Sequence, residues 1–106
     1  MDADTIRQNA LLRLSQIFNV PVEALRPEYR FGEDLKPSFV SDFRDNELDQ
    51  VNCDIHDVAD RATVRDFVSG HLIIWTVEEY CQHMIQCSRT KPKAVQWVLR
   101  MGPERA

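Results

Sequence analysis

The chain has 106 residues, enough for one small domain with a single modest core. Its composition, 43% apolar and 28% charged, is that of a soluble globular protein, and no apolar run comes near the length of about 20 residues that crosses a bilayer. The formal net charge of −4 makes duplex nucleic acid an unsuitable partner, because an acidic surface repels the phosphate backbone.

The N-terminus and the cysteines indicate the compartment. Met1-Asp2-Ala3-Asp4 is acidic and is not followed by an apolar signal core, so we expect no secretion signal. The three cysteines, Cys53, Cys81 and Cys87, are an odd number and too sparse for a disulfide scaffold. We therefore expect a cytoplasmic protein with reduced thiols.

A first helix is predicted from Thr5, because Thr5 and Gln8 have the spacing of a capping box. Its apolar residues recur on one face with a helical period: Ile6, Ala10, Leu11, Leu14, Ile17 and Phe18. Asn19 and Pro21 end it. Residues 19–40 contain three prolines and predict a long loop with short helical turns at most. The apolar residues that can fix this loop to the body are Val20, Val22, Leu25, Tyr29, Phe31 and Leu35.

A second helix is predicted to begin near Ser41 or Asp42, either of which can cap the free amides of a first turn. Its inner stripe is formed by Phe43, Leu48, Val51, Ile55, Val58, Ala59 and Ala62. Two capping boxes follow, at Thr63–Asp66 and at Thr76–Glu79. The first opens a short helix that Gly70 ends, and the second opens the last helix of the main bundle.

The remaining segments complete an all-α prediction. Residues 71–75 (HLIIW) are a short apolar stretch, either a buried connector or strand-like, and Trp75 is expected to fill the core. Pro92 is suited to the first turn of a short fifth helix. The sequence thus predicts a small four-helix bundle with a long first loop in residues 1–88, followed by a basic C-terminal tail, residues 89–106, with an extra short helix.

Several short motifs occur in an order typical of one family. In chain order they are NVPVEAL at 19–25, FGEDL at 31–35, Glu47-Leu48 and Thr76-Val77. Together they resemble the acyl carrier protein family over residues 5–86. The resemblance implies a phosphopantetheine arm on a serine at the start of the second helix, and docking on partner enzymes through that acidic helix. Thr63-Val64 is a competing match for the opening of the family's last helix, and the sequence leaves both open.

The serine that carries the arm is the point at which the resemblance fails. When Glu47-Leu48 is aligned with the family's "EL", the serine of the family's "DSL" motif corresponds to Asp42. The arm is joined through a phosphodiester, which needs an alcohol oxygen, and aspartate has none. Ser41 keeps a hydroxyl near the helix start, and Ser38 lies further out in the loop. We therefore expect no cofactor, with phosphopantetheine on Ser41, or less favourably on Ser38, as the alternative.

An uneven charge distribution favours a basic partner. Residues 41–60 hold seven acids against Arg44, whereas residues 88–106 carry a net charge of +4. The acids expected to meet the basic surface of a synthase, a transferase or another protein are Asp42, Asp45, Glu47, Asp49, Asp54 and Asp57. An ordinary solvated helix face is the alternative reading of these acids.

The leading hypothesis from the sequence is a non-catalytic acyl-carrier-like module that docks partner enzymes through its acidic second helix. The first alternative is a true carrier, modified on Ser41, in a specialised fatty acid, lipid or polyketide biosynthesis pathway.

A metal-binding or regulatory helical module is the second alternative. Cys53 with His56 and His83 with Cys87 are spaced one helical turn apart, so the four side chains can ligate zinc if the two helices meet there. Neither pair has the spacing of a recognised zinc finger, and we expect no metal. Nucleophilic catalysis would also need an orienting group and an oxyanion site, and three glycines are too few for a phosphate loop, so we expect no enzyme.

Overall fold

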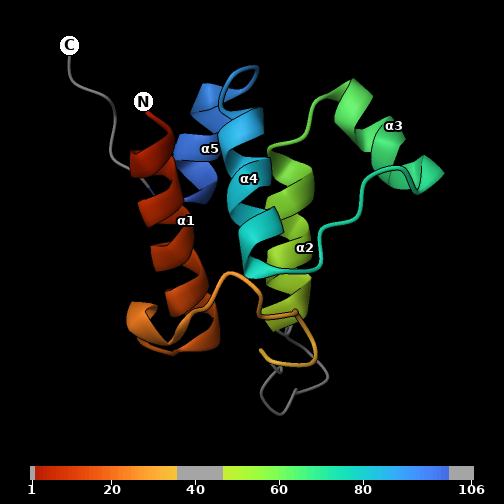
Figure 1. Ribbon diagram of the computed structural model, residues 1–106. Helices are drawn as coiled ribbons and strands as arrows, with labels where there is room; N and C mark the ends of the chain where they lie inside the picture. Colours follow the sequence, from red (N-terminus) through yellow and green to blue (C-terminus); the bar gives the residue numbers. More distant parts are fainter. Residues whose placement is uncertain (1, 36–46, 101–106) are drawn as a thin grey trace.

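The computed structural model describes residues 2–35 and 47–100, and in this part the chain is all-α (Figure 1). The elements are α1 (Ala3–Phe18), a 3₁₀ turn (Val22–Ala24), α2 (Glu47–Asp57), α3 (Arg61–Ser69), α4 (Val77–Cys87) and α5 (Pro92–Val98). The predicted fold class is therefore confirmed, including the extra helix near the C-terminus. The predicted start of the second helix at Ser41 or Asp42 lies outside the described residues.

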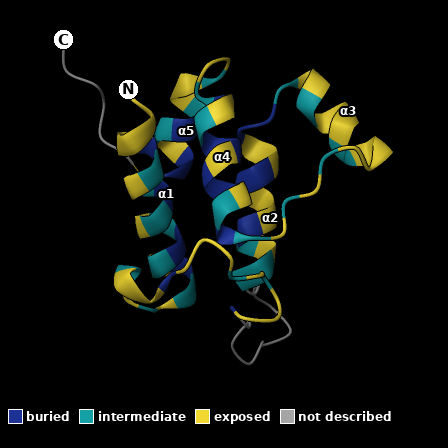
Figure 2. Cartoon of the chain, in the orientation of Figure 1, coloured by how far each residue is buried: buried dark blue, intermediate teal, exposed yellow. Residues whose placement is uncertain are grey.

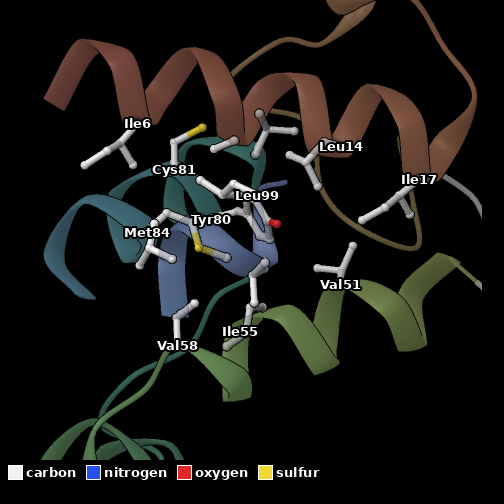
Figure 3. Close-up of a cluster of buried hydrophobic side chains, with 14 of the residues drawn as sticks. Ile6, Leu14, Ile17, Val51, Ile55, Val58, Tyr80, Cys81, Met84 and Leu99 are labelled. Atoms are coloured by element: carbon white, nitrogen blue, oxygen red, sulfur yellow. The ribbon is translucent and has the colours of Figure 1, made fainter. Parts of the chain in front are cut away.

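Helix α4 is the centre of the bundle. It packs along α1 and also contacts α2 and α5, and the buried faces of the helices point toward it (Figures 1 and 2). The fully buried side chains include Ile6, Leu14, Val58, Val77, Tyr80, Cys81, Met84 and Val95. Figure 3 shows several of them converging between α1, α2 and α4. Cys81 is one of these buried core residues.

Helix α5 belongs to the same core. Pro92 is its first residue, as predicted, and Val95, Val98 and Leu99 are buried with the side chains of α2 and α4. The described part of the basic tail is therefore packed against residues 1–88. Trp97 lies on the opposite side of α5 and is 77% exposed.

The long loop is fixed by its own apolar side chains. Leu25 and Leu35 are buried, and Val20, Tyr29 and Phe31 pack against the core, as predicted. The backbone amide of Phe31 donates to the carbonyl oxygen of Trp75 at 2.8 Å, which ties the loop to the segment that precedes α4.

Two helix starts differ from the prediction. The N-cap of α1 is Asp2, whose carboxylate accepts from the amide of Thr5 at 2.7 Å, and the N-cap of α3 is Asp60, whose carboxylate accepts from the amide of Thr63 at 2.8 Å. Each threonine expected to be the cap is thus the third residue of its helix. A charged carboxylate is the stronger acceptor at the positive end of a helix.

The other predicted helix boundaries agree with the structure. Asn19 ends α1 and Gly70 ends α3, both in the left-handed conformation. Thr76 caps α4 with a complete capping box, in which its hydroxyl accepts from the Glu79 amide and the Glu79 carboxylate accepts from the Thr76 amide. The inner stripe predicted to run on to Ala62 is interrupted, because α2 ends at Asp57.

Helix α3 stands away from the rest of the bundle (Figure 1). None of its nine residues is buried, and its principal packed side chain is Phe67. The Phe67 ring lies between the imidazoles of His56 and His83, with ring centroids 5.3 and 5.5 Å away. Residues 71–75 form an irregular connector from α3 back to α4. Trp75 is 47% exposed with Arg30 over its ring, so its expected core position is wrong.

Candidate functional site

Helix α2 has one buried side and one exposed side. Val51 and Ile55 are buried against α1 and α4, whereas Asp49, Asn52, Cys53, His56 and Asp57 are exposed. Of the six acids predicted to meet a partner, Asp49 and Asp57 are exposed and Glu47 is partly exposed. We call these three residues the α2 acids. The exposed side of α2 is therefore acidic, but it carries fewer charges than the sequence predicted.

The α2 acids differ in their relation to the helix dipole. Glu47 and Asp49 lie in the first turn, where a negative charge stabilises the helix. Asp57 is the last helical residue, where a negative charge is unfavourable. Local helix stability therefore accounts for Glu47 and Asp49 but not for Asp57.

Asp54 is the predicted docking residue that the structure contradicts. The residue is 4% exposed, and its carboxylate accepts from Arg13 at two points, from Nε at 2.8 Å and from Nη2 at 3.1 Å. The hydroxyl of Tyr80 donates to the same carboxylate at 2.9 Å. Burial and the neighbouring Asp54 charge raise the pKa of Tyr80 well above its ordinary value. Asp54 thus joins α1, α2 and α4 from inside and is not available to a partner.

Four predicted residues lie outside the described part of the chain. These are Ser38 and Ser41, the two candidates for phosphopantetheine, and the acids Asp42 and Asp45.

The four candidate metal ligands are divided between two environments. Cys53 and His56 are on the exposed side of α2, whereas His83 and Cys87 are buried on α4. The Phe67 ring occupies the space between His56 and His83. Within residues 2–35 and 47–100, no three histidine, cysteine or acidic side chains come together as a metal would require.

The buried pair on α4 has its own hydrogen bonds. Nε2 of His83 lies 2.8 Å from the carbonyl oxygen of Ile55, so this nitrogen carries the proton and donates it. The Cys87 sulfur lies 3.7 Å from both ring nitrogens, and because Nε2 donates to Ile55, Nδ1 is the nitrogen that can accept from the thiol. Burial lowers the pKa of His83 and raises the pKa of Cys87 to about 11. Cys87 therefore keeps its proton near neutral pH. A nucleophile or a metal ligand would need the deprotonated thiolate instead.

An apolar groove that sequence reasoning missed lies beside this pair. It has a volume of about 430 Å³ and runs between α4 and the connector, with Leu72, Ile73 and Ile74 on one wall. His83, Cys87, Glu79 and Gln82 contribute to the other wall. The uncharged sequence of residues 71–75 could have indicated an apolar wall. That α4 lies opposite this wall could be learned only from the three-dimensional fold.

The comparisons with known proteins leave the family open. No protein-family model matches the chain, and neither the search of curated proteins nor the search of solved structures found a match. In the part of the chain that the structure describes, no helix is both long enough and apolar enough to span a membrane.

Proposed function

We propose that this chain is a non-catalytic, acyl-carrier-like binding module of the cytoplasm that docks on a basic surface of a partner enzyme through the α2 acids. The observation that supports this most is the two-sided nature of α2. One side is fixed in the core by Val51, Ile55 and the buried Asp54, and the other presents Asp49 and Asp57 to solvent.

A rigid helix with exposed acids is suited to electrostatic docking. Charges held by a packed helix keep their positions before the partner arrives, so the encounter costs little ordering of the backbone. Exposed charges raise the association rate and select partners of opposite sign more than they raise affinity. The partner surface in this proposal carries lysine and arginine side chains and belongs to a synthase or transferase.

We propose a non-catalytic role because the buried thiols and the buried imidazole are in environments that disfavour reaction. The thiols of Cys81 and Cys87 are buried and their pKa values are raised to about 11. The imidazole of His83 is held by the Ile55 carbonyl oxygen and faces a protonated thiol. Groups held in this way are suited to packing and poorly suited to nucleophilic attack.

The same proposal excludes a phosphopantetheine arm. Asp42 corresponds to the family's serine and has no alcohol oxygen for the phosphodiester. A true carrier modified on Ser41 is the competing function, and a mass measurement described in the Discussion separates the two.

Charge reversal tests the docking surface. The variant Asp49→Lys/Asp57→Lys is immobilised, and its capture of partner proteins from an extract of the source cells is compared with that of the wild type. The matched control is Glu23→Lys/Glu28→Lys, which changes the net charge equally at exposed positions of the loop. We expect capture to be lost with the α2 variant and kept with the control. Equal capture by both variants contradicts the proposal.

A further inference from the structure

Helix α3 exposes an apolar face that the fold does not use. Val64 and Val68 are one turn apart and are 37% and 84% exposed. Phe67, three residues after Val64, lies at the edge of this face and packs between two histidines. Residues three and four apart share a helix face, so the two valines form one continuous apolar strip, in which Val68 is the more exposed residue.

Two arginines border this strip. Arg61 and Arg65 are exposed and, by the same helical spacing, lie beside Val64 and Val68. No ion pair holds either guanidinium among the residues that the structure describes. Arg61 is the first residue of α3, where a positive charge opposes the helix dipole. Local stability therefore does not explain a basic residue at this position.

We propose that the exposed face of α3, formed by Arg61, Val64, Arg65 and Val68, binds an amphipathic helix of another protein that carries acidic residues beside apolar ones. The valines pack against the apolar stripe of that helix, and each guanidinium pairs with a carboxylate in two-point geometry. Charge complementarity thus decides which kind of helix fits.

The charges of this face argue against two other occupants. A two-fold contact with a second copy of α3 would bring arginines close to arginines, which like-charge repulsion disfavours. An anionic lipid surface would attract the arginines but repel Asp57, Asp60 and Asp66, which flank the same face in sequence, and a chain with net charge −4. An acidic helix is narrower than a membrane surface and can contact the two arginines along the strip, with Asp60 beside them.

This surface lies near Asp57, one of the α2 acids, but away from the other two. Helix α3 follows the C-terminal end of α2 and stands out from the bundle there, whereas Glu47 and Asp49 lie at the opposite end of α2 (Figure 1). The two surfaces also select opposite charges. A protein with both can hold a basic partner and an acidic one at the same time.

The binding of designed helical peptides tests the inference. The probe is a labelled peptide of about 18 residues, five helical turns, with leucines along one face and glutamates beside them. A second peptide has lysine in place of every glutamate. We expect wild-type protein to bind the acidic peptide at least about tenfold more tightly than the basic peptide. For the variant Arg61→Glu/Arg65→Glu we expect the reverse order.

Two further variants separate charge from packing. Arg26→Glu/Arg89→Glu makes the same change in net charge at exposed positions elsewhere and should bind like the wild type. Val68→Ser should weaken the acidic peptide without changing the preference for acidic over basic peptide. Since Val68 is 84% exposed, this variant should fold normally, which circular dichroism checks.

Four results would overturn the inference. These are no binding of the acidic peptide at millimolar concentration, equal binding of both peptides, binding of anionic vesicles that is lost in Arg61→Glu/Arg65→Glu, and self-association that is lost in Val68→Ser. The α2 variant Asp49→Lys/Asp57→Lys should still bind the acidic peptide. The peptide assay therefore tests binding by α3 independently of docking by α2, and either proposal can fail without the other.

Discussion

Arg13 of α1 and Asp54 of α2 form a two-point ion pair inside the protein, with Nε–Oδ2 and Nη2–Oδ1 distances of 2.8 and 3.1 Å. The side chains are only 14% and 6% exposed, and Tyr80 of α4 donates to the same carboxylate. Among the described residues no buried side-chain nitrogen or oxygen lacks a hydrogen-bond partner, so the pair can hold three helices together in an otherwise apolar core without an unsatisfied polar group.

Replacement of Asp54 by asparagine should destabilise the protein strongly. The substitution keeps the shape of the side chain but leaves the Arg13 guanidinium without its counter-charge in a poorly hydrated site. We expect the free energy of unfolding in urea to fall by about 3 kcal/mol. Asp57→Asn, at an exposed position of the same helix, is the control and should change it by no more than about 0.5 kcal/mol. Equal effects of the two substitutions would show that Asp54 is not buried with Arg13.

The stability of the protein should fall as the pH drops below 6.5. Burial lowers the pKa of His83 beneath the ordinary value of 6.5, and the neighbouring His56 acts in the same direction. The unfolded chain therefore takes up a proton at about pH 6.5, before the folded protein does, and the contribution of His83 is fully present only above that pH.

Urea unfolding between pH 5 and 8 measures this effect. His83→Gln, which keeps a donor for the Ile55 carbonyl oxygen, should flatten the pH dependence below about pH 6.5. His71→Gln, at an exposed position, should retain the wild-type curve. An unchanged slope in His83→Gln would mean that His83 does not titrate as its burial implies.

Thr63 and Thr76, both predicted to open capping boxes, should respond differently to replacement by alanine. Thr76 is the true N-cap of α4, the central helix, so Thr76→Ala should cost about 1 kcal/mol of unfolding free energy. Thr63 lies inside the first turn of α3, where Asp60 is the cap, so Thr63→Ala should cost less. Thermal unfolding of both variants checks the order, and a larger loss for Thr63→Ala would contradict the assignment of the caps.

The residues in front of each threonine explain why the sequence alone misidentified two caps. Thr5 and Thr63 are each preceded three residues earlier by an aspartate, Asp2 or Asp60, which competes for the amide and wins. Thr76 is preceded at that distance by Ile73, which has no acceptor side chain, and there the predicted box forms. A negative charge three residues before a threonine is a local signal that can be read from sequence.

The positions of Asp54 and Trp75 could not be predicted from the sequence, because they depend on tertiary contacts. Asp54 shares the inner face of α2 with Val51 and Ile55, but its counter-charge is Arg13, 41 positions away, and no local pattern joins them. Trp75 follows an apolar run typical of a core segment, yet the connector passes over the surface because α3 stands away from the bundle. The helical periodicity of α1, α4 and α5 was sufficient for the fold class, because those helices bury regular stripes.

Incubation with coenzyme A and a broad-specificity phosphopantetheinyl transferase should leave the intact mass unchanged. The reason is chemical, since in the proposed resemblance Asp42 takes the place of the serine that would accept the phosphodiester. A carrier protein with an ordinary serine motif, modified in the same tube, is the positive control. A gain of one phosphopantetheine that disappears in Ser41→Ala, or in Ser38→Ala, would establish the chain as a true carrier.

The association rate with a captured partner, measured at increasing salt concentration, tests the docking proposal most directly. If the α2 acids guide the encounter, the wild-type rate should fall steeply with salt, and Asp49→Lys/Asp57→Lys should associate at least about tenfold more slowly at low salt. Glu23→Lys/Glu28→Lys should behave nearly as the wild type. Equal rates for the two double variants, or a rate that does not depend on salt, would contradict electrostatic docking through α2.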